Sequence, residues 1–216
     1  MNKFCIVGLG EHSKSKLIPA IDKSKNILKA IVSRKSGLEL KYKDISIFTD
    51  LSTAVKSLEK DVIFIIATPP DTHFKILKVV LQNEFNAMVE KPILLSFEHF
   101  KKIQDLSEAN GVAFYECFMH RYGNIYKNFI NIYKINKKNI ELIEMVFCLP
   151  DLPDNTFRDN DTISSSVIYD IGCYPISLLN DLDITDKTIQ IKRIENIRNY
   201  KEEKFDIEVK AANTKF

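Results

Sequence analysis

Two glycines at the end of an apolar run are the first residues whose spacing points to chemistry. Gly8-Leu-Gly10 closes the run at residues 3–8 and precedes a stretch of helical period at residues 13–22. At a strand-to-helix junction, glycines allow a tight turn and a close backbone approach to a pyrophosphate, which the next helix N-terminus stabilises. An ordinary strand-to-helix turn is the alternative interpretation. Ser13 takes the third glycine position, where a small side chain is tolerated.

The end of the second apolar run carries the next informative residues. An acidic residue about 20 positions after the glycines normally binds the adenosine ribose hydroxyls. This chain has Ser33-Arg34-Lys35 there instead. A lost carboxylate and two gained cations favour a 2′-phosphate, because a guanidinium binds phosphate through two parallel hydrogen bonds. We therefore predict NADP, with NAD as the alternative cofactor and an ordinary basic loop as the alternative interpretation.

A proline-rich segment follows the strand-like run at residues 61–67. Thr68-Pro69-Pro70 forms a stiff turn that lacks two N–H donors, and Thr72 is placed to cap the next helix. His73 follows it. A histidine here is either a packing residue at the helix start or a residue in contact with the cofactor.

Glu90-Lys91-Pro92 ends the strand-like run at residues 87–90. In a parallel sheet, ligands gather at the carboxyl ends of the strands. Because a proline fixes the adjoining backbone, Lys91 is expected to do more than carry a solvated charge.

Strand-like runs and helix-period stretches alternate through the first half of the chain. We expect strands at 3–8, 26–33, 45–48, 61–67, 87–90 and 112–116, and helices at 13–22, 51–58, 72–83 and 96–110. Strands separated by helices indicate βαβ units, and runs that are apolar on both faces fit strands covered by helices on each side. The first half is therefore predicted to be an α/β doubly wound parallel sheet, with residues 1–118 as an NAD(P)-binding Rossmann domain.

The second half has a different pattern. We expect helices at 122–135 and 164–181, a strand at 140–148, and a polar loop at 150–161. Residues 189–197 and 205–216 alternate with period two, as antiparallel strands with one wet face do. Residues 119–216 are predicted to form a partial α+β domain with an incomplete antiparallel sheet, which serves substrate binding and oligomerisation.

Five segments together resemble the glucose–fructose oxidoreductase/inositol dehydrogenase family, also called Gfo/Idh/MocA. In the family's order they are GLG at 8–10, ATPPDTHF at 67–74, EKP at 90–92, ECFMHRY at 116–122 and YDIGCYPISLL at 169–179. The resemblance implies an NAD(P)-dependent oxidoreductase. Such an enzyme transfers hydride between the nicotinamide and a hydroxyl or keto carbon of a sugar or polyol.

The same resemblance implies roles for particular residues. Lys91 lies beside the nicotinamide and the substrate hydroxyl, and Pro92 follows a cis peptide bond. Tyr174 is the proton donor or acceptor, and Asp170 holds a substrate hydroxyl. A nearby cation lowers a tyrosine pKa from its usual value of ~10, which suits proton transfer. Asp170 and Tyr174 lie four residues apart on the expected helix and so share one face; the alternative is that this face packs on the first domain.

The cofactor is expected to contact residues from several of these segments. Arg121 matches a basic residue that relatives use near the cofactor or at the domain junction, and a solvated charge is the alternative. The full predicted set is Gly8, Gly10, Glu11, Ser33, Arg34, Thr68, Pro69, His73, Glu90, Lys91 and Arg121.

Two departures from the family pattern favour a different class of protein. Ser164-Ser165-Ser166 replaces a glycine-rich run before the DxG helix, and family members commonly continue well beyond this length. The alternative is a non-catalytic dinucleotide-binding protein, acting as a sensor or an assembly partner. An unfinished sheet exposes an unpaired edge, so a homo-oligomer through the C-terminal sheet is expected, with a truncated product as the alternative.

Composition limits the classes of partner. Lys and Arg total 31 against 29 acidic residues, so neither nucleic acid nor a membrane surface is expected to bind. The 4 cysteines form no CxxC pair, which predicts thiols in a reducing compartment and no metal site. With no apolar leader and no run near the ~20 residues of a membrane span, the chain is expected to be cytoplasmic and to act on a small molecule.

Overall fold

The computed structural model describes residues 1–35, 44–140, 142–146, 163–182, 187–195 and 204–211. The chain divides into two compact units, Met1–Cys117 and Phe118–Phe216. Each unit has a hydrophobic core of its own.

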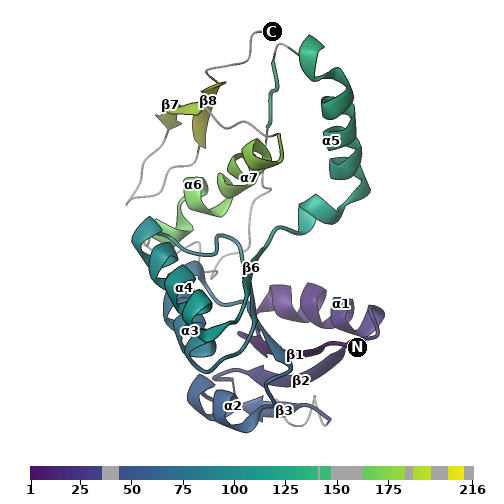
Figure 1. Ribbon diagram of the computed structural model, residues 1–216, viewed down its shortest axis with the longest axis vertical. Helices are drawn as coiled ribbons and strands as arrows, with labels where there is room; N and C mark the ends of the chain where they lie inside the picture. Colours follow the sequence, from purple (N-terminus) through teal and green to yellow (C-terminus); the bar gives the residue numbers. More distant parts are fainter. Residues whose placement is uncertain (36–43, 141, 147–162, 183–186, 196–203, 212–216) are drawn as a thin grey trace. The chain divides into compact units, whose positions relative to one another are not determined.

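A six-stranded parallel sheet forms the centre of the first unit, in the order β3-β2-β1-β4-β5-β6 (Figure 1). The chain runs outward from β1 to β3 and then returns to the other side of β1, which places a topological switch between β1 and β4. This order is that of a Rossmann fold, so the predicted parallel sheet is confirmed. The strands are β1 (Lys3–Val7), β2 (Ile27–Val32), β3 (Ser46–Phe48), β4 (Val62–Ile66), β5 (Ala87–Glu90) and β6 (Phe114–Cys117).

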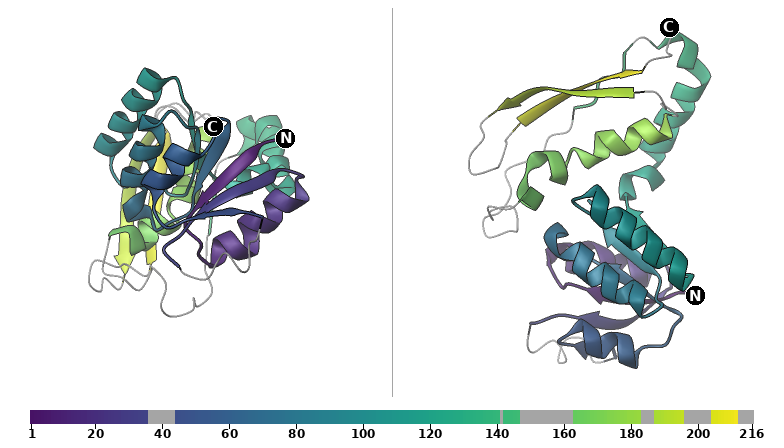
Figure 2. Two further views of the ribbon diagram at one scale, coloured as in Figure 1. Left: turned by 90° about the horizontal axis from the view of Figure 1, so that it is seen from below. Right: turned by 60° about the vertical axis from the view of Figure 1, so that its left-hand side comes forward.

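Helices cover both faces of this sheet (Figure 2). On one face, Cys5 and Val7 belong to the cluster that includes residues of α2, α3 and α4; on the other, Phe4 and Ile6 belong to the cluster that includes Ile21 of α1. Successive β1 residues therefore pack in opposite directions, which is why the strand reads as one unbroken apolar run. The helices are α1 (Ile18–Lys23), α2 (Leu51–Ser57), α3 (Pro70–Gln82) and α4 (Phe97–Asn110).

Local capping residues explain where these helices begin and end. The Asp50 carboxylate accepts the Thr53 N–H at 2.8 Å at the start of α2, and Ser96 Oγ accepts the His99 N–H at 3.1 Å at the start of α4. Gly111 ends α4 in the left-handed conformation, with φ of 64°.

The predicted capping role of Thr72 is wrong. Helix α3 begins at Pro70, so Thr72 lies inside its first turn, and the Thr72 hydroxyl donates to the Pro69 carbonyl at 2.7 Å. Proline suits the first helical position because the N–H it lacks has no partner there.

The helix after the glycine turn is irregular. A π-helical turn at Ser13–Leu17 precedes α1, where a single helix was expected over 13–22. Pro19 has no N–H to donate to the preceding turn, so one helical hydrogen bond is missing there. Prolines and π-bulges are common causes of helix irregularity.

The second unit contains α5 (Asn124–Asn136), α6 (Val167–Asp170) and α7 (Cys173–Asp181). Short 3₁₀ turns lie at Met119–Tyr122, Lys137–Asn139 and Ile163–Ser165. Tyr133 of α5 packs with Leu178 and Leu182 in its core. Strands β7 (Lys187–Glu195) and β8 (Lys204–Ala211) pair antiparallel, and the larger incomplete sheet stays a prediction.

Two predictions for the second half are corrected by the structure. The helix expected over 164–181 is broken, because α6 ends at Asp170 and α7 starts at Cys173. Pro175 supplies no N–H to the Ile171 carbonyl, which removes a hydrogen bond across this break. Asp170 and Tyr174 therefore lie on different helices, and the shared face inferred from their spacing is wrong.

The strand expected over 140–148 is also wrong where it is described, because residues 142–146 form no strand and are mostly exposed. A strand needs a neighbour to accept its hydrogen bonds, and no described strand pairs with these residues. The loop expected at 150–161 lies outside the described residues. No helix in the described part of the chain is long and apolar enough to cross a membrane.

Candidate functional site

The carboxyl ends of four neighbouring strands bring the predicted cofactor residues to one edge of the sheet. Val7 of β1 pairs with Val32 of β2 and with Ile66 of β4, and Ile66 pairs with Val89 of β5. The residues that follow these strands must therefore be neighbours at that edge. They are Gly8, Ser33, Thr68 and Lys91.

Gly8 is required by the fold itself. Its φ is 98°, a conformation that side-chain-bearing residues rarely adopt, and a Cβ there would lie 2.8 Å from both the Ala67 carbonyl oxygen and Thr68 Cγ2. The Gly8 N–H donates to the Val32 carbonyl at 3.0 Å. This glycine lets the turn after β1 lie against the turn after β4.

Gly10 is different, because the fold gives no reason for it to be a glycine. A Cβ at Gly10 would meet no atom of the described chain within 4 Å, and its φ lies outside the left-handed region. The space above this backbone is open, as a turn that admits a ligand requires.

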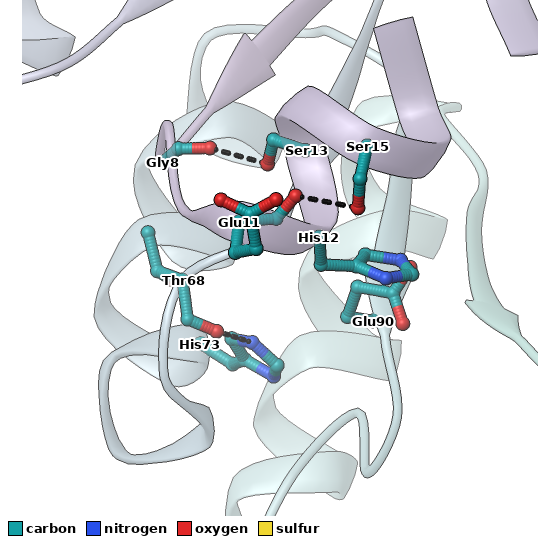
Figure 3. Close-up of polar contacts among 8 residues, drawn as sticks. All are labelled: Gly8, Glu11, His12, Ser13, Ser15, Thr68, His73 and Glu90. Carbon is teal, nitrogen blue, oxygen red and sulfur yellow. Dashed lines mark hydrogen bonds and ion pairs between the residues drawn. The ribbon is translucent and has the colours of Figure 1, made fainter. Parts of the chain in front are cut away.

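Ser13 closes the turn from the helix side. Its side chain is fully buried, and its hydroxyl donates to the Gly8 carbonyl at 2.7 Å (Figure 3). The serine at the third glycine position therefore stabilises the turn. Glu11 is exposed at the helix start, and its carbonyl accepts the Ser15 hydroxyl at 2.8 Å.

Ser33 and Arg34 lie directly after β2. Ser33 is buried, donates its N–H to the Phe48 carbonyl at 2.9 Å and accepts the Lys35 N–H on Oγ at 3.2 Å. This Ser-turn leaves the Arg34 side chain exposed beside the sheet edge.

His73 is fully buried, and both its ring nitrogens face main-chain carbonyls. Nε2 lies 2.8 Å from the Thr68 carbonyl oxygen and Nδ1 lies 3.0 Å from that of Pro92. Burial lowers the pKa of His73 below its usual value, against the opposing effects of these carbonyls and the Glu90 charge. The packing interpretation of His73 fits this geometry, because both ring nitrogens face carbonyls inside the protein; the predicted contact with the cofactor stays a prediction.

The turn that carries Lys91 is held on both sides. The Lys91–Pro92 peptide bond is cis, as the family resemblance implied. Before it, Glu90 Oε1 lies 3.0 Å from His12 Nε2 (Figure 3); after it, the Ile93 N–H donates to the Glu116 carboxylate at 2.8 Å. The Lys91 side chain is half-buried at this edge.

In the second unit, Tyr174 belongs to an aromatic cluster around His120. The His120 ring makes edge-to-face contacts with Phe118, Tyr126 and Tyr174 at centroid distances of 5.5, 4.9 and 5.0 Å. Burial, followed by the Arg121 charge, lowers the pKa of His120. Both its ring nitrogens are buried without a hydrogen-bond partner in the described structure. Asp170 is buried in the same unit.

Arg121 is an ion-pair partner in this unit rather than a solvated charge. Its guanidinium binds the Asp181 carboxylate, which also accepts the Tyr126 hydroxyl at 2.5 Å. Burial and this hydrogen bond raise the pKa of Tyr126. The contact predicted between Arg121 and the cofactor stays a prediction.

Two of the described cysteines have thiols with raised pKa values. Burial raises the pKa of Cys5 to about 12, and burial together with the Glu90 and Glu116 charges raises that of Cys117 to about 12. Within the described residues, Cys5, Cys117 and Cys173 form no disulfide.

Comparison with known proteins identifies the family. Residues 2–118 match the Gfo/Idh/MocA family, described as an oxidoreductase family with an NAD-binding Rossmann fold. The chain belongs to the Gfo/Idh/MocA oxidoreductase family. None of the curated proteins matches it.

Solved structures share this Gfo/Idh/MocA fold. An oxidoreductase from Bacillus cereus is similar with a TM-score of 0.76 at 17% identity, covering 99% of this chain and 62% of its own. A scyllo-inositol dehydrogenase from Lactobacillus casei, solved with NAD(H) and scyllo-inositol, has a TM-score of 0.58 at 23% identity, covering 64% of this chain and 42% of its own.

A third similar structure is the WlbA dehydrogenase from Chromobacterium violaceum, solved with NADH and UDP-GlcNAcA. Its TM-score is 0.58 at 15% identity, covering 64% of this chain and 41% of its own. The chain thus spans at most about three fifths of the length of these family structures.

The sequence did not point to three residues that the structure brings into contact with predicted site residues or with the Lys91 turn. His12 reaches Glu90, Glu116 holds the segment after Lys91, and His120 packs on Tyr174. The contact of Glu116 had a detectable signal, because it ends the strand-like run that follows 87–90, and such runs are usually neighbours in a parallel sheet. The contacts of His12 and His120 had none.

Proposed function

We propose that this chain is an NADP-dependent oxidoreductase acting on a hydroxyl or keto carbon of a sugar or polyol. The observation that carries the proposal is the open space above Gly10, at the switch between β1 and β4, on the same sheet edge as the Lys91 turn. The family supports nicotinamide chemistry in general. The sugar class rests on what the similar dehydrogenases were solved with.

The residues at this edge fit a dinucleotide. In the proposed arrangement Gly8, Gly10 and the N-terminus of the helix that follows would hold the pyrophosphate. Ser33 and the exposed Arg34 bind the 2′-phosphate, and Glu11, Thr68, Pro69 and Glu90 border the cofactor. A bound nicotinamide supplies or accepts the hydride.

The protein's own groups handle the proton and the substrate. Tyr174 exchanges a proton with the substrate oxygen, and Asp170 accepts a hydrogen bond from a substrate hydroxyl. The Lys91 ammonium stabilises negative charge on that oxygen. Its half-buried position at the sheet edge supports this role.

A non-catalytic dinucleotide-binding protein is the second candidate. Ser164, Ser165 and Ser166 are all buried, and Ser166 Oγ accepts the Tyr169 N–H at 3.4 Å as the cap of α6. Because the Ser166 hydroxyl is used within the fold as this cap, the serine run favours the binding protein.

Titration separates the two candidates. The purified chain is titrated with NADPH and with NADH by fluorescence, and turnover is then measured with a panel of sugars and polyols. We expect tighter binding of NADPH, and a reaction that is lost in Lys91→Ala and Tyr174→Phe while NADPH still binds. Tight binding without any reaction favours the binding protein, and a preference for NADH contradicts the assignment of Ser33 and Arg34.

A further inference from the structure

Side chains from two other elements hold the main chain directly after Lys91. Nδ1 of His73, from α3, lies 3.0 Å from the Pro92 carbonyl oxygen. The carboxylate of Glu116, from β6, accepts the Ile93 N–H at 2.8 Å. Two successive polar groups of the turn are thus fixed from different parts of the fold.

Neither residue has a place in the proposed chemistry. His73 is fully buried with both ring nitrogens facing carbonyls, and the described contact of Glu116 is to the main chain. Burying an imidazole and part of a carboxylate is unfavourable unless their hydrogen bonds compensate for lost hydration. Two such groups converging on one dipeptide therefore point to a constraint on that dipeptide.

We propose that His73 and Glu116 are positioning residues that fix the Pro92–Ile93 main chain and thereby the Lys91 amine. The inference rests on the function proposed above for Lys91. The backbone of this turn sets where the Lys91 side chain starts, so a displacement of the Pro92–Ile93 peptide would move the region that its amine can reach. A misplacement of about 1 Å at a reacting group costs roughly 100-fold in rate.

His73 also links this turn to the one after β4. Its Nε2 lies 2.8 Å from the Thr68 carbonyl oxygen, so one ring spans the segments that follow two adjacent strands. A neutral imidazole has a single N–H and donates to one carbonyl only. The proposal requires that hydrogen on Nδ1, facing the Pro92 carbonyl, and the variants below test this requirement.

Two substitutions of His73 distinguish the contacts. The amide of His73→Asn takes the place of Nδ1 and can donate to Pro92, whereas that of His73→Gln takes the place of Nε2 and can donate to Thr68. We expect His73→Asn to keep most of the wild-type kcat, and His73→Gln to lose at least 10-fold, a loss of about 1.4 kcal/mol in transition-state stabilisation. The Kd for NADPH should be similar in both. Equal kcat values, or the reverse order, overturn the proposal.

Glu116 offers a matched pair of its own. The side-chain oxygen of Glu116→Gln still accepts the Ile93 N–H, whereas Glu116→Ala leaves that N–H without its acceptor. We expect Glu116→Ala to lower kcat at least 10-fold without raising KM to the same degree, and Glu116→Gln to restore most of it. A loss of kcat in both variants, in step with their loss of thermal stability, assigns Glu116 a structural role only and overturns the proposal.

Two measurements test this pair of contacts, here called the clamp (His73 to Pro92 and Glu116 to Ile93), without relying on turnover. Amide hydrogen exchange of Ile93, followed by NMR, should be slow in the wild type and in Glu116→Gln and at least 10-fold faster in Glu116→Ala and His73→Gln. The ¹³C resonance of reductively methylated Lys91, assigned with Lys91→Arg, should sharpen in the same two variants as the amine gains mobility. If the wild type reduces or oxidises no sugar, the proposed function fails, and these readouts still decide the clamp: unchanged exchange and line width overturn it.

Discussion

At the scale of single residues, the two glycines of one turn serve different purposes. Gly8 is needed because of its φ of 98° and its contact with the turn after β4, whereas Gly10 faces open space. The sequence predicts the same role for both, because both belong to one glycine motif. The difference allows folding and binding to be tested separately.

Substituting the two glycines by alanine should have opposite effects. We expect Gly8→Ala to lower the free energy of unfolding by about 2–3 kcal/mol, through strain at positive φ and a clash with the Ala67 carbonyl. Gly10→Ala should leave stability unchanged or raise it by ~0.5 kcal/mol, yet weaken NADPH binding at least ~10-fold because the methyl group fills the ligand space. Urea unfolding and fluorescence titration measure the two quantities. Unaltered NADPH affinity in Gly10→Ala would contradict the proposed pyrophosphate position.

The buried His73 should make stability fall in mild acid. Because burial lowers its folded-state pKa from 6.5, the unfolded chain binds the proton first as pH falls below this value. The stabilisation is fully present above that pH and is lost as pH falls toward the folded-state pKa. Urea unfolding at a series of pH values, in the wild type and in His73→Gln, measures the slope. The variant should show a smaller decline over this window, and an identical decline would exclude His73 as its source.

At the scale of elements, a proline accompanies the division of one predicted helix of the second unit into two. Residues 164–181 have a helical pattern, yet the structure divides them into α6 and α7 around Ile171 and Gly172, just before Pro175. Spacing of four residues therefore does not place Asp170 and Tyr174 on one helix face. Instead, Tyr174 packs through its ring against His120 and Phe118.

The start of α2 offers a test of an element boundary. Asp50 accepts both the N–H and the hydroxyl of Thr53 at 2.8 Å. Asp50→Ala should lower the free energy of unfolding, and with it the midpoint of denaturation, through loss of the helix cap. Asp50→Asn, which can still accept from the Thr53 N–H, serves as the control and should lose only a small part of this. Chemical denaturation monitored by circular dichroism measures both, and equal losses would show that charge rather than capping matters here.

At the scale of the whole molecule, the first unit belongs to a family with an NAD-binding Rossmann fold. Its preference between NADPH and NADH can be measured through the stability of the folded chain. A ligand that binds only the folded chain stabilises it by about 2.7 kcal/mol when present at ~100 times its Kd. If Arg34 binds the 2′-phosphate as proposed, NADPH should raise the melting temperature more than NADH at equal concentration. In Arg34→Ala the advantage of NADPH should shrink by roughly 10-fold in affinity or more, because a charge-assisted contact is lost. An unchanged ratio would show that Arg34 does not read the 2′-phosphate.

Much of the first unit was predictable from sequence. The apolar runs and their glycine, proline and serine boundaries located β1 to β6 and the intervening helices, and the strand-end residues Gly8, Ser33, Thr68 and Lys91 followed from these. Prediction works here because the apolar runs of strands covered on both faces, and the residues that cap or terminate helices, are local properties of the chain. The second unit was less predictable, since the strand expected over 140–148 depends on a neighbour that the local pattern does not supply.

The sequence by itself determined the family, the order of the elements in the first unit and the identities of the residues at its sheet edge. Only the tertiary structure decided what holds those residues. His73 meets Pro92 and Thr68, Glu116 meets Ile93, and His12 meets Glu90 because parallel strands distant in sequence end side by side. A linear pattern records which side chains are present, whereas contacts between them depend on the register of the sheet and on the packing of helices against it.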